Sequence, residues 1–164
     1  MFNLNDNLKN KKFLIYGYGK TGNASYNYLK KNNKISIYDD NKKVKKFSIS
    51  FKKIRISEFD YIVLSPGIDI NKCKLKKYLN NNKNKIITDL DIFYLNNEEN
   101  LKITITGTNG KSTTAKLLFE ILKDQKKDVI IAGNIGIPIL SLKKVTQKTI
   151  FVIEASSYQL EYSK

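Results

Sequence analysis

Short apolar segments alternate along this chain with segments of helical spacing, and this alternation restricts the possible folds more than any other feature. Apolar segments such as Phe13 to Tyr16 and Tyr61 to Leu64 have the length of strands, and turn residues follow them. Strands that are joined by helices form parallel sheets with helices on both faces. The sequence therefore predicts an α/β fold. The expected strands are residues 13–16, 35–38, 61–64, 86–87, 101–105, 129–132 and 150–154, and the expected helices are residues 21–31, 75–79, 89–95 and 112–123.

The polar segment Leu95 to Asn100 has no apolar period, so we take it as the link between two units. Thr88 precedes a helical segment and is expected to cap it. Helical spacing also indicates which side chains face the core. The inward-facing residues expected on the helices are Ala24, Tyr28, Leu29, Ala115, Leu118, Phe119 and Leu122.

The composition argues against several classes of protein. The chain has 164 residues, no His and one Cys, so it lacks the commonest metal ligand and cannot form an internal disulfide. No apolar run is long enough for a membrane span, and Met1 to Lys12 lacks the apolar core of a signal peptide. We therefore expect a cytoplasmic protein.

The net charge of +15, from 30 basic and 15 acidic residues, permits nonspecific binding of nucleic acid. However, Arg55 is the one arginine, although arginine is preferred where phosphates are recognised by paired hydrogen bonds. The lysines are spread along the chain, and the aromatic residues do not interleave with them as stacking platforms require. We interpret the charge as a solvated surface and expect no specific nucleic acid partner, but a basic nucleic-acid-binding module stays an alternative.

Gly17, Gly19 and Gly22 form the first motif, a G-x-G-x-x-G spacing between a strand and a helix. Such glycines allow a tight turn and bring a phosphate close to the backbone N–H groups of the helix N-terminus. Asp39 ends the next predicted strand, where an acidic residue often binds a ribose hydroxyl. The motif does not distinguish NAD from other phosphate-bearing ligands, so an NAD(P)-binding oxidoreductase domain is an alternative. A turn that serves only packing is another.

The segment Thr106 to Thr113 is the second motif, and it also lies between a strand and a helix. The strict phosphate-loop pattern fails, because Ile105 stands where its first glycine belongs. Two glycines, Lys111 and Ser112 nevertheless supply backbone N–H groups for phosphates, a cation to neutralise them and a hydroxyl that can reach Mg²⁺.

Two further polar segments follow predicted strands. Glu154 ends a strand, and ligands bind at the carboxyl ends of parallel strands, so Glu154 is placed to share a Mg²⁺ with Ser112. The turn Gly133 to Pro138 follows the preceding strand and is a candidate ligand-facing turn.

The run TGTNGKSTT at Thr106 to Thr114 resembles the ATP loop of the Mur ligases, which build the peptide of peptidoglycan. The segments SPGI, GNIGIP and EASSYQLE fit the same family, and the last is similar to the members that add D-glutamate. The resemblance implies a ligase that uses ATP and Mg²⁺ to join D-glutamate to UDP-N-acetylmuramoyl-L-alanine through an acyl phosphate. It also implies a Rossmann-like UDP-sugar-binding domain at residues 1–97 and the truncated start of a P-loop ATPase-type α/β domain at residues 98–164.

The same resemblance assigns roles to individual residues. Lys111 and Glu154 are expected to be catalytic, and Ser112 and Glu154 to bind Mg²⁺. The expected ATP-binding residues are Gly107, Thr108, Asn109, Gly110, Lys111, Ser112 and Thr113, and the expected substrate-binding residues are Thr21, Asp39, Ser65, Pro66, Gly67, Asn134, Ser156 and Gln159.

Mur ligases have three domains in a chain more than twice this length, and they use a later His and a carboxylated Lys for a second metal ion. Because this chain has no His, we expect that it does not ligate by itself. We also expect a monomer that does not associate with membranes. A folate-type ligase or another Mur ligase is an alternative, because these enzymes share the ATP loop.

Overall fold

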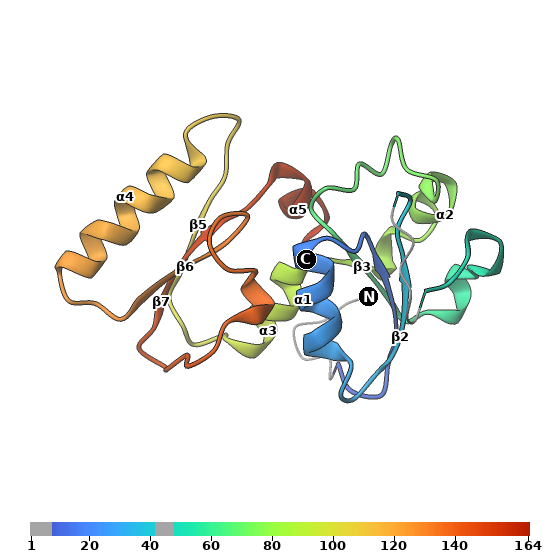
Figure 1. Cartoon of the computed structure of the whole chain (residues 1–164), viewed down its shortest axis with the longest axis horizontal. Coiled ribbons are helices and arrows are strands. Elements are labelled where there is room, and N and C mark those ends of the chain that lie inside the picture. The colour runs from blue at the N-terminus through green and yellow to red at the C-terminus, as the bar shows by residue number, and fades with distance from the viewer. Residues whose placement is uncertain (1–7, 42–47) are drawn as a thin grey trace.

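Two parallel sheets follow one another along the long axis of the molecule (Figure 1). The computed structural model describes residues 8–41 and 48–164. Most of the segment Met1 to Lys12, in which we found no signal peptide, therefore lies outside the described residues. The expected α/β fold with parallel sheets is confirmed. The helices and strands are β1 (Lys12–Tyr16), α1 (Lys20–Leu29), β2 (Lys34–Tyr38), β3 (Tyr61–Leu64), α2 (Lys76–Asn80), β4 (Ile86–Ile87), α3 (Asp89–Asn96), β5 (Lys102–Ile105), α4 (Lys111–Asp124), β6 (Val129–Gly133), β7 (Ile150–Glu154) and α5 (Ser157–Tyr162), with 3-10 turns η1 (Phe51–Lys53), η2 (Ile56–Glu58), η3 (Lys83–Lys85) and η4 (Ile139–Ser141).

The first sheet has the strand order β2-β1-β3-β4, and all its neighbours run parallel. Side chains of a strand alternate between the two faces, so Phe13 and Ile15 join one buried cluster while Leu14 and Tyr16 join another. Helix α1 contributes to the first cluster, and α2 with the turn η2 contributes to the second. Both faces of this sheet are therefore covered, as a parallel sheet requires.

The second sheet has the order β5-β7-β6 and is also parallel. The central strand β7 is buried, whereas the outer strands β5 and β6 are mostly half-buried. Helix α4 lies along this sheet, and α5 returns from it toward the first sheet (Figure 1).

One buried cluster extends through both sheets. It contains Ile15 from the first sheet and Ile153 from the second. Phe93 of α3 belongs to it as well, and its ring centre lies 4.8 Å from that of Phe151 at an interplanar angle of 90°. The two sheets thus share a core through α3.

All the strands predicted from the sequence are present, and each agrees with its prediction to within one residue at either end. One prediction about a helix face is wrong. Tyr28 is 44% exposed, because the buried stripe of α1 runs through Gly22, Ser25 and Leu29 and leaves Tyr28 at its edge. On α4 only Ala115 is buried, because the helix covers a narrow sheet. The other three residues expected to face inward there, Leu118, Phe119 and Leu122, are half-buried, whereas the apolar Leu117 and Ile121 of the same helix are exposed, so the predicted inward face of α4 is confirmed.

In the part of the chain that the structure describes, no helix has the length and apolar character needed to span a membrane.

Helix α3 begins at a buried N-terminus that a capping box closes. Thr88 caps it as predicted, because its hydroxyl accepts a hydrogen bond from the backbone N–H of Asp91. The Asp91 carboxylate in turn accepts one from the N–H of Thr88 at 2.6 Å. Asp89, the first residue of the helix, is only 2% exposed.

Burial raises the pKa of Asp89 to about 6, and the neighbouring Asp91 adds to this, whereas hydrogen bonds from Gln159 and from backbone N–H groups oppose it. The folded protein therefore holds this proton more tightly than the unfolded chain, whose value is 3.8. The stability that this group contributes is present at low pH and is lost as the pH rises through about 6.

We expect the free energy of unfolding of the wild type, measured relative to that of Asp89→Asn, to fall by up to about 3 kcal/mol between about pH 4 and about pH 7. Urea denaturation at several pH values measures this difference. The exposed variant Glu120→Gln, which removes a carboxylate from the surface of α4, should show no such slope. A flat difference for Asp89→Asn would mean that Asp89 titrates normally in the folded protein.

Candidate nucleotide and substrate site

A pocket of about 380 Å³ lies at the carboxyl ends of the strands of the first sheet and also receives residues from the second. Loops that follow β1, β2, β3 and β6 meet there, which is the usual place for a ligand in a parallel sheet. The lining residues are Gly17, Gly19, Lys20, Thr21, Asp39, Asn41, Ser65, Pro66, Gly67, Ile68, Gly133, Asn134, Gly136 and Pro138. Six of the eight substrate-binding residues expected from the sequence lie in this set.

The three glycines of the first motif are required for different reasons. A Cβ on Gly22 would lie 2.0 Å from the carbonyl oxygen of Gly17. Gly17 itself has a φ of +92°, and a Cβ there would lie 2.8 Å from the Cβ of Ser65. Gly19 lines the pocket and has nothing within 4 Å of its Cβ position. Packing thus requires two of these glycines, and the third leaves the backbone open to a ligand.

Polar side chains form hydrogen bonds with the backbone of the loops that line this pocket. The Asp39 carboxylate accepts hydrogen bonds from the backbone N–H groups of Tyr18 at 2.6 Å and Asn41 at 2.9 Å. The Ser65 hydroxyl donates to the carbonyl oxygen of Gly17 at 2.7 Å. These two residues therefore fix the loops that a ligand would touch.

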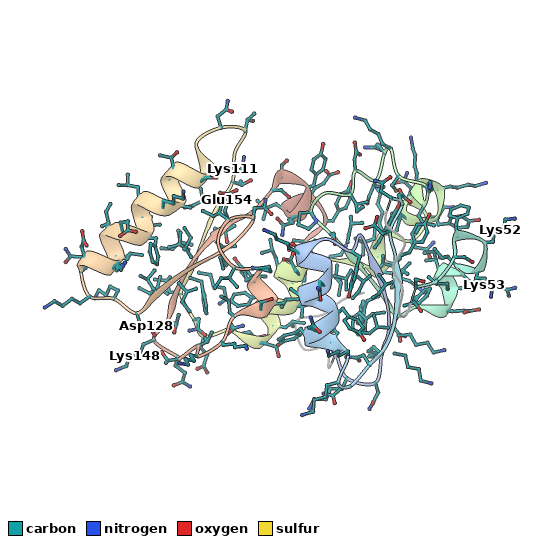
Figure 2. All side chains as sticks on the ribbon, viewed as in Figure 1. Lys52, Lys53, Lys111, Asp128, Lys148 and Glu154 are labelled. Carbon is teal, nitrogen blue, oxygen red and sulfur yellow. The ribbon has the colours of Figure 1, made fainter. Side chains whose placement is uncertain are left out.

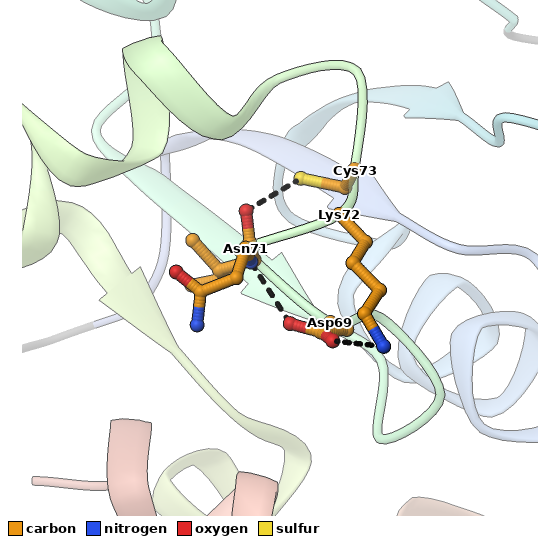
Figure 3. A network of polar contacts seen from close by, with 5 residues as sticks. Asp69, Asn71, Lys72 and Cys73 are labelled. Carbon is orange, nitrogen blue, oxygen red and sulfur yellow. Dashed lines mark hydrogen bonds and ion pairs between the residues drawn. The ribbon is translucent and has the colours of Figure 1, made fainter.

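The segment after Gly67 is held by its own polar contacts (Figure 3). Asp69 accepts a hydrogen bond from the backbone N–H of Asn71 at 2.9 Å and lies 3.7 Å from the ammonium of Lys72. Cys73 donates weakly to the carbonyl oxygen of Ile70 at 3.5 Å. These contacts support the SPGI turn that lines the pocket.

Lys20 is a pocket residue that the sequence analysis did not select. It is the first residue of α1, where a cation would neutralise the charge of a phosphate held by the helix N-terminus. The sequence could have indicated this role, because Lys20 lies within the glycine motif.

The N-termini of α1 and α4 differ from those of α3 and α5. The N-cap residues of α1 and α4 are Gly19 and Gly110, which offer no side-chain cap, and neither helix has an acidic residue in its first turn. In contrast, Thr88 and Ser156 cap α3 and α5 in closed capping boxes. The first N–H groups of α1 and α4 are therefore free to bind an anion.

The second motif forms the loop between β5 and α4. Gly107 and Gly110 have φ values of +147° and +76°, so this loop needs glycine at both positions. The ammonium of Lys111 folds back and donates to the carbonyl oxygens of Gly107 at 2.7 Å and Thr108 at 3.3 Å. Of the other expected ATP-binding residues, Thr108, Asn109 and Thr113 are exposed on the loop and the start of α4.

Glu154 lies beside this loop, at the end of β7. It is 4% exposed, and its Oε2 accepts a hydrogen bond of 2.6 Å from the hydroxyl of Ser112. Figure 2 shows Lys111 and Glu154 at one end of the second sheet and Asp128 and Lys148 at the other. The predicted pairing of Ser112 with Glu154 is thus present in the folded chain.

The chemistry of this pair suits Mg²⁺. A hydroxyl and a carboxylate supply two hard oxygen ligands, and Mg²⁺ commonly takes one or two from the protein and the rest from phosphates and water. Within residues 8–41 and 48–164, no three or more His, Cys, Asp and Glu side chains gather as a metal cluster. The pair therefore fits a metal ion that arrives with a nucleotide.

Strands β6 and β7 connect the loop to the pocket. Gly133 is paired with Glu154 in the sheet, and its φ of +107° turns the chain sharply. The next residue, Asn134, donates its backbone N–H to the carbonyl oxygen of Glu154 at 3.0 Å and lines the pocket. One residue of the pocket is thus bonded directly to the residue that contacts Ser112.

Ser156 and Gln159 lie outside the set of pocket residues. Their side chains form the capping box of α5, and Gln159 is only 1% exposed. Their predicted role in substrate binding is untested, but the structure gives Gln159 a different set of partners.

Comparison with known proteins shows which family the chain is similar to. The model for the Mur ligase middle domain matches residues 105–164, which begin at the second motif. A UDP-N-acetylmuramoylalanine–D-glutamate ligase of Rickettsia bellii (strain RML369-C) is 38% identical over 165 residues, and the match covers 95% of this chain and 36% of that protein. The chain is similar to the Mur ligases over nearly its whole length.

Other relatives agree. Proteins of the same name from Wolbachia sp. subsp. Brugia malayi (strain TRS) and from Caldicellulosiruptor bescii are 40% and 35% identical, and the matches cover 93% and 96% of this chain. They cover 33% and 38% of those two proteins, so this chain spans about a third of the length of its curated relatives. The similarity includes the first sheet, because it extends over nearly the whole chain.

Proposed function

We propose that the chain is the UDP-sugar- and ATP-binding part of a ligase that joins D-glutamate to UDP-N-acetylmuramoyl-L-alanine. This is a step of peptidoglycan biosynthesis, on which cell shape and division depend. The relatives' names support these substrates, and they favour a ligase over an oxidoreductase domain and over a nucleic acid module.

The observation that carries this proposal is the direct bond between the two halves of the site. Asn134 in the pocket and Glu154 beside the glycine loop are joined by a hydrogen bond of 3.0 Å. A ligand in the pocket and a nucleotide on the loop would therefore meet at the ends of neighbouring strands. The reaction needs this proximity, because the phosphate of ATP must reach the substrate's carboxylate.

In the first proposed domain, residues 1–97, the first turn of α1 binds the diphosphate of UDP. Thr21, Ser65, Pro66 and Gly67 contact the UDP moiety, and Asp39 lies near the nucleoside. Asn134 contacts the muramoyl part, because it enters the pocket from the second sheet. We retain Ser156 and Gln159 as proposed contacts of the muramoyl part. Their closeness to Glu154 in the sequence supports this proposal.

In the second proposed domain, residues 98–164, the loop from Gly107 to Thr113 binds ATP. Lys111 exchanges the two loop carbonyls for phosphate oxygens, because these carry the larger negative charge. Ser112 and Glu154 would hold Mg²⁺, which would supply charge neutralisation at the phosphates. The chain thus positions the reactants and lowers the electrostatic cost of phosphoryl transfer.

The substrate carboxylate then attacks the terminal phosphorus, and ADP leaves. The amine of D-glutamate attacks the resulting acyl phosphate, forms the amide and releases phosphate. We further propose that the protein acts as a monomer in the cytoplasm.

Calorimetric titration of the chain with UDP, ATP with Mg²⁺, and NADH tests the proposal. We expect UDP and ATP each to bind at one site and NADH not to bind. Binding of NADH without UDP would overturn the proposal in favour of an oxidoreductase domain. Binding of single-stranded DNA that survives high salt would favour a nucleic acid module, because nonspecific binding falls steeply with salt.

A further inference from the structure

Gln159 is a buried amide whose two ends bond to different parts of the molecule. Its Oε1 accepts hydrogen bonds from the backbone N–H of Ser156 at 3.0 Å and from the Ser156 hydroxyl at 3.2 Å. Its Nε2 donates to Oδ1 of Asp89 at 2.8 Å. Because Oε1 is committed to Ser156, Gln159 can present only a donor to Asp89.

Asp89 is a matching acceptor. It is 2% exposed, its Oδ1 accepts the hydrogen bond from Gln159, and the backbone N–H groups of Asp89 and Leu90 favour its charged form by lowering its pKa. Because only donors face this carboxylate, a side chain that offers a donor at this position would leave a buried group unpaired.

Asp91, which follows Asp89 closely in α3, makes the second connection. Its Oδ1 accepts hydrogen bonds from the Ser163 hydroxyl at 2.7 Å and from the backbone N–H of Lys164 at 2.6 Å. Tyr162 of α5 packs against the cluster on the far face of the first sheet. Helix α5 is therefore tied to α3 at both of its ends.

These contacts bridge the two sheets near the carboxyl ends of β4 and β7. Helix α3 directly follows the last strand of the first sheet, and α5 directly follows β7 of the second (Figure 1). Glu154 ends β7 and lies two residues before Ser156. A shift of α5 along α3 would thus move Glu154, and with it the hydrogen-bonded Asn134, relative to Thr21 and the rest of the pocket.

We propose that Asp89 is a positioning residue, which through the amide of Gln159 keeps Asn134 and the end of β7 in register with the UDP pocket of the first sheet. This inference rests on the proposed function, because it supposes a ligand that contacts both sheets. A ligand confined to the first sheet would not depend on the bridge. A ligand that extends to Asn134 would lose affinity when the bridge loosens.

A donor–acceptor exchange tests the proposal in the 164-residue chain. Asp89→Asn places an amide donor against the donor of Gln159, and Gln159→Glu places two buried carboxylates together. The double variant reverses the hydrogen bond: the carboxylate introduced at position 159 accepts from Ser156 with one oxygen and from the new amide at position 89 with the other. Glu120→Gln is the matched control, because it removes one carboxylate at an exposed position of α4.

The affinities for UDP-N-acetylmuramoyl-L-alanine and for UDP are measured for each variant by calorimetry, together with the melting temperature. We expect each single variant to weaken binding of the full substrate about tenfold while UDP binding changes less than about twofold. The double variant should regain most of the lost affinity, and Glu120→Gln should match the wild type. An equal loss for both ligands, or no recovery in a folded double variant, would overturn the proposal.

If the single variants do not fold, Ser163→Ala supplies the same test, because it removes only the outer bond to Asp91. Here we expect about a threefold loss for the full substrate alone, and equal changes for both ligands would contradict the bridge. A wild type that binds neither UDP compound would refute the proposed function instead. A wild type that binds both, with every variant unchanged, would refute only the role of Asp89.

Discussion

Lys111→Ala should weaken the binding of ATP by about tenfold to a hundredfold and leave the binding of UDP unchanged. A charged hydrogen bond contributes about 1.5–3 kcal/mol, and the ammonium of Lys111 is the one cation within the glycine loop. The side chain is half-buried and bonds to loop carbonyls, so its removal should cost little stability. Calorimetric titration with ATP and Mg²⁺ measures the change.

Lys116→Ala is the control, because it removes the same charge from an exposed position on the same helix. It should bind ATP like the wild type, which separates a local contact from the general effect of the net charge. Equal losses for the two variants would mean that ATP is attracted by the overall positive charge and that the loop has no specific role.

Gly22→Ala should lower the free energy of unfolding by about 1–2 kcal/mol. The new Cβ would lie 2.0 Å from the carbonyl oxygen of Gly17, so α1 or the loop must move. Overpacking of this kind costs about 1–3 kcal/mol and occasionally more, and the higher helix propensity of alanine returns about 1 kcal/mol. Urea denaturation followed by circular dichroism measures the loss.

Gly19→Ala provides the contrast at the neighbouring glycine. Nothing lies within 4 Å of its Cβ position, so the cost in stability should stay below about 1 kcal/mol. The methyl group would nevertheless project where we propose that the diphosphate approaches, and UDP affinity should fall about tenfold. If Gly19→Ala binds UDP normally, the loop serves packing alone and the proposed diphosphate site is wrong.

The strands could be located in advance because their signals are local. A buried strand such as Ile150–Glu154 is apolar at nearly every position, and polar residues mark its end. The same holds for the cap at Thr88, which depends on residues within one helical turn. The phosphate loop is local as well, because two glycines, a lysine and a serine are consecutive or nearly so.

Sequence patterns offered no guidance where a residue's surroundings come from distant parts of the chain. Phe119 was expected to be in the core, but its burial depends on how much sheet lies beneath α4. Gln159 belongs to a recognisable motif, yet its partner Asp89 lies 70 residues away in sequence. No local pattern marks such a contact.

The sequence by itself determined the alternating α/β order and the two glycine loops, because backbone preferences and strand ends follow from neighbouring residues. It also indicated that Ser112 lies near Glu154, because the carboxyl ends of parallel strands and the helix starts that follow them meet at one edge of a sheet. Only the tertiary structure decided that the turn at Asn134 enters the pocket of the first sheet and that α5 is bonded to α3. These contacts depend on how two sheets pack around Phe93 and Phe151, and packing of that kind is a property of the folded chain as a whole.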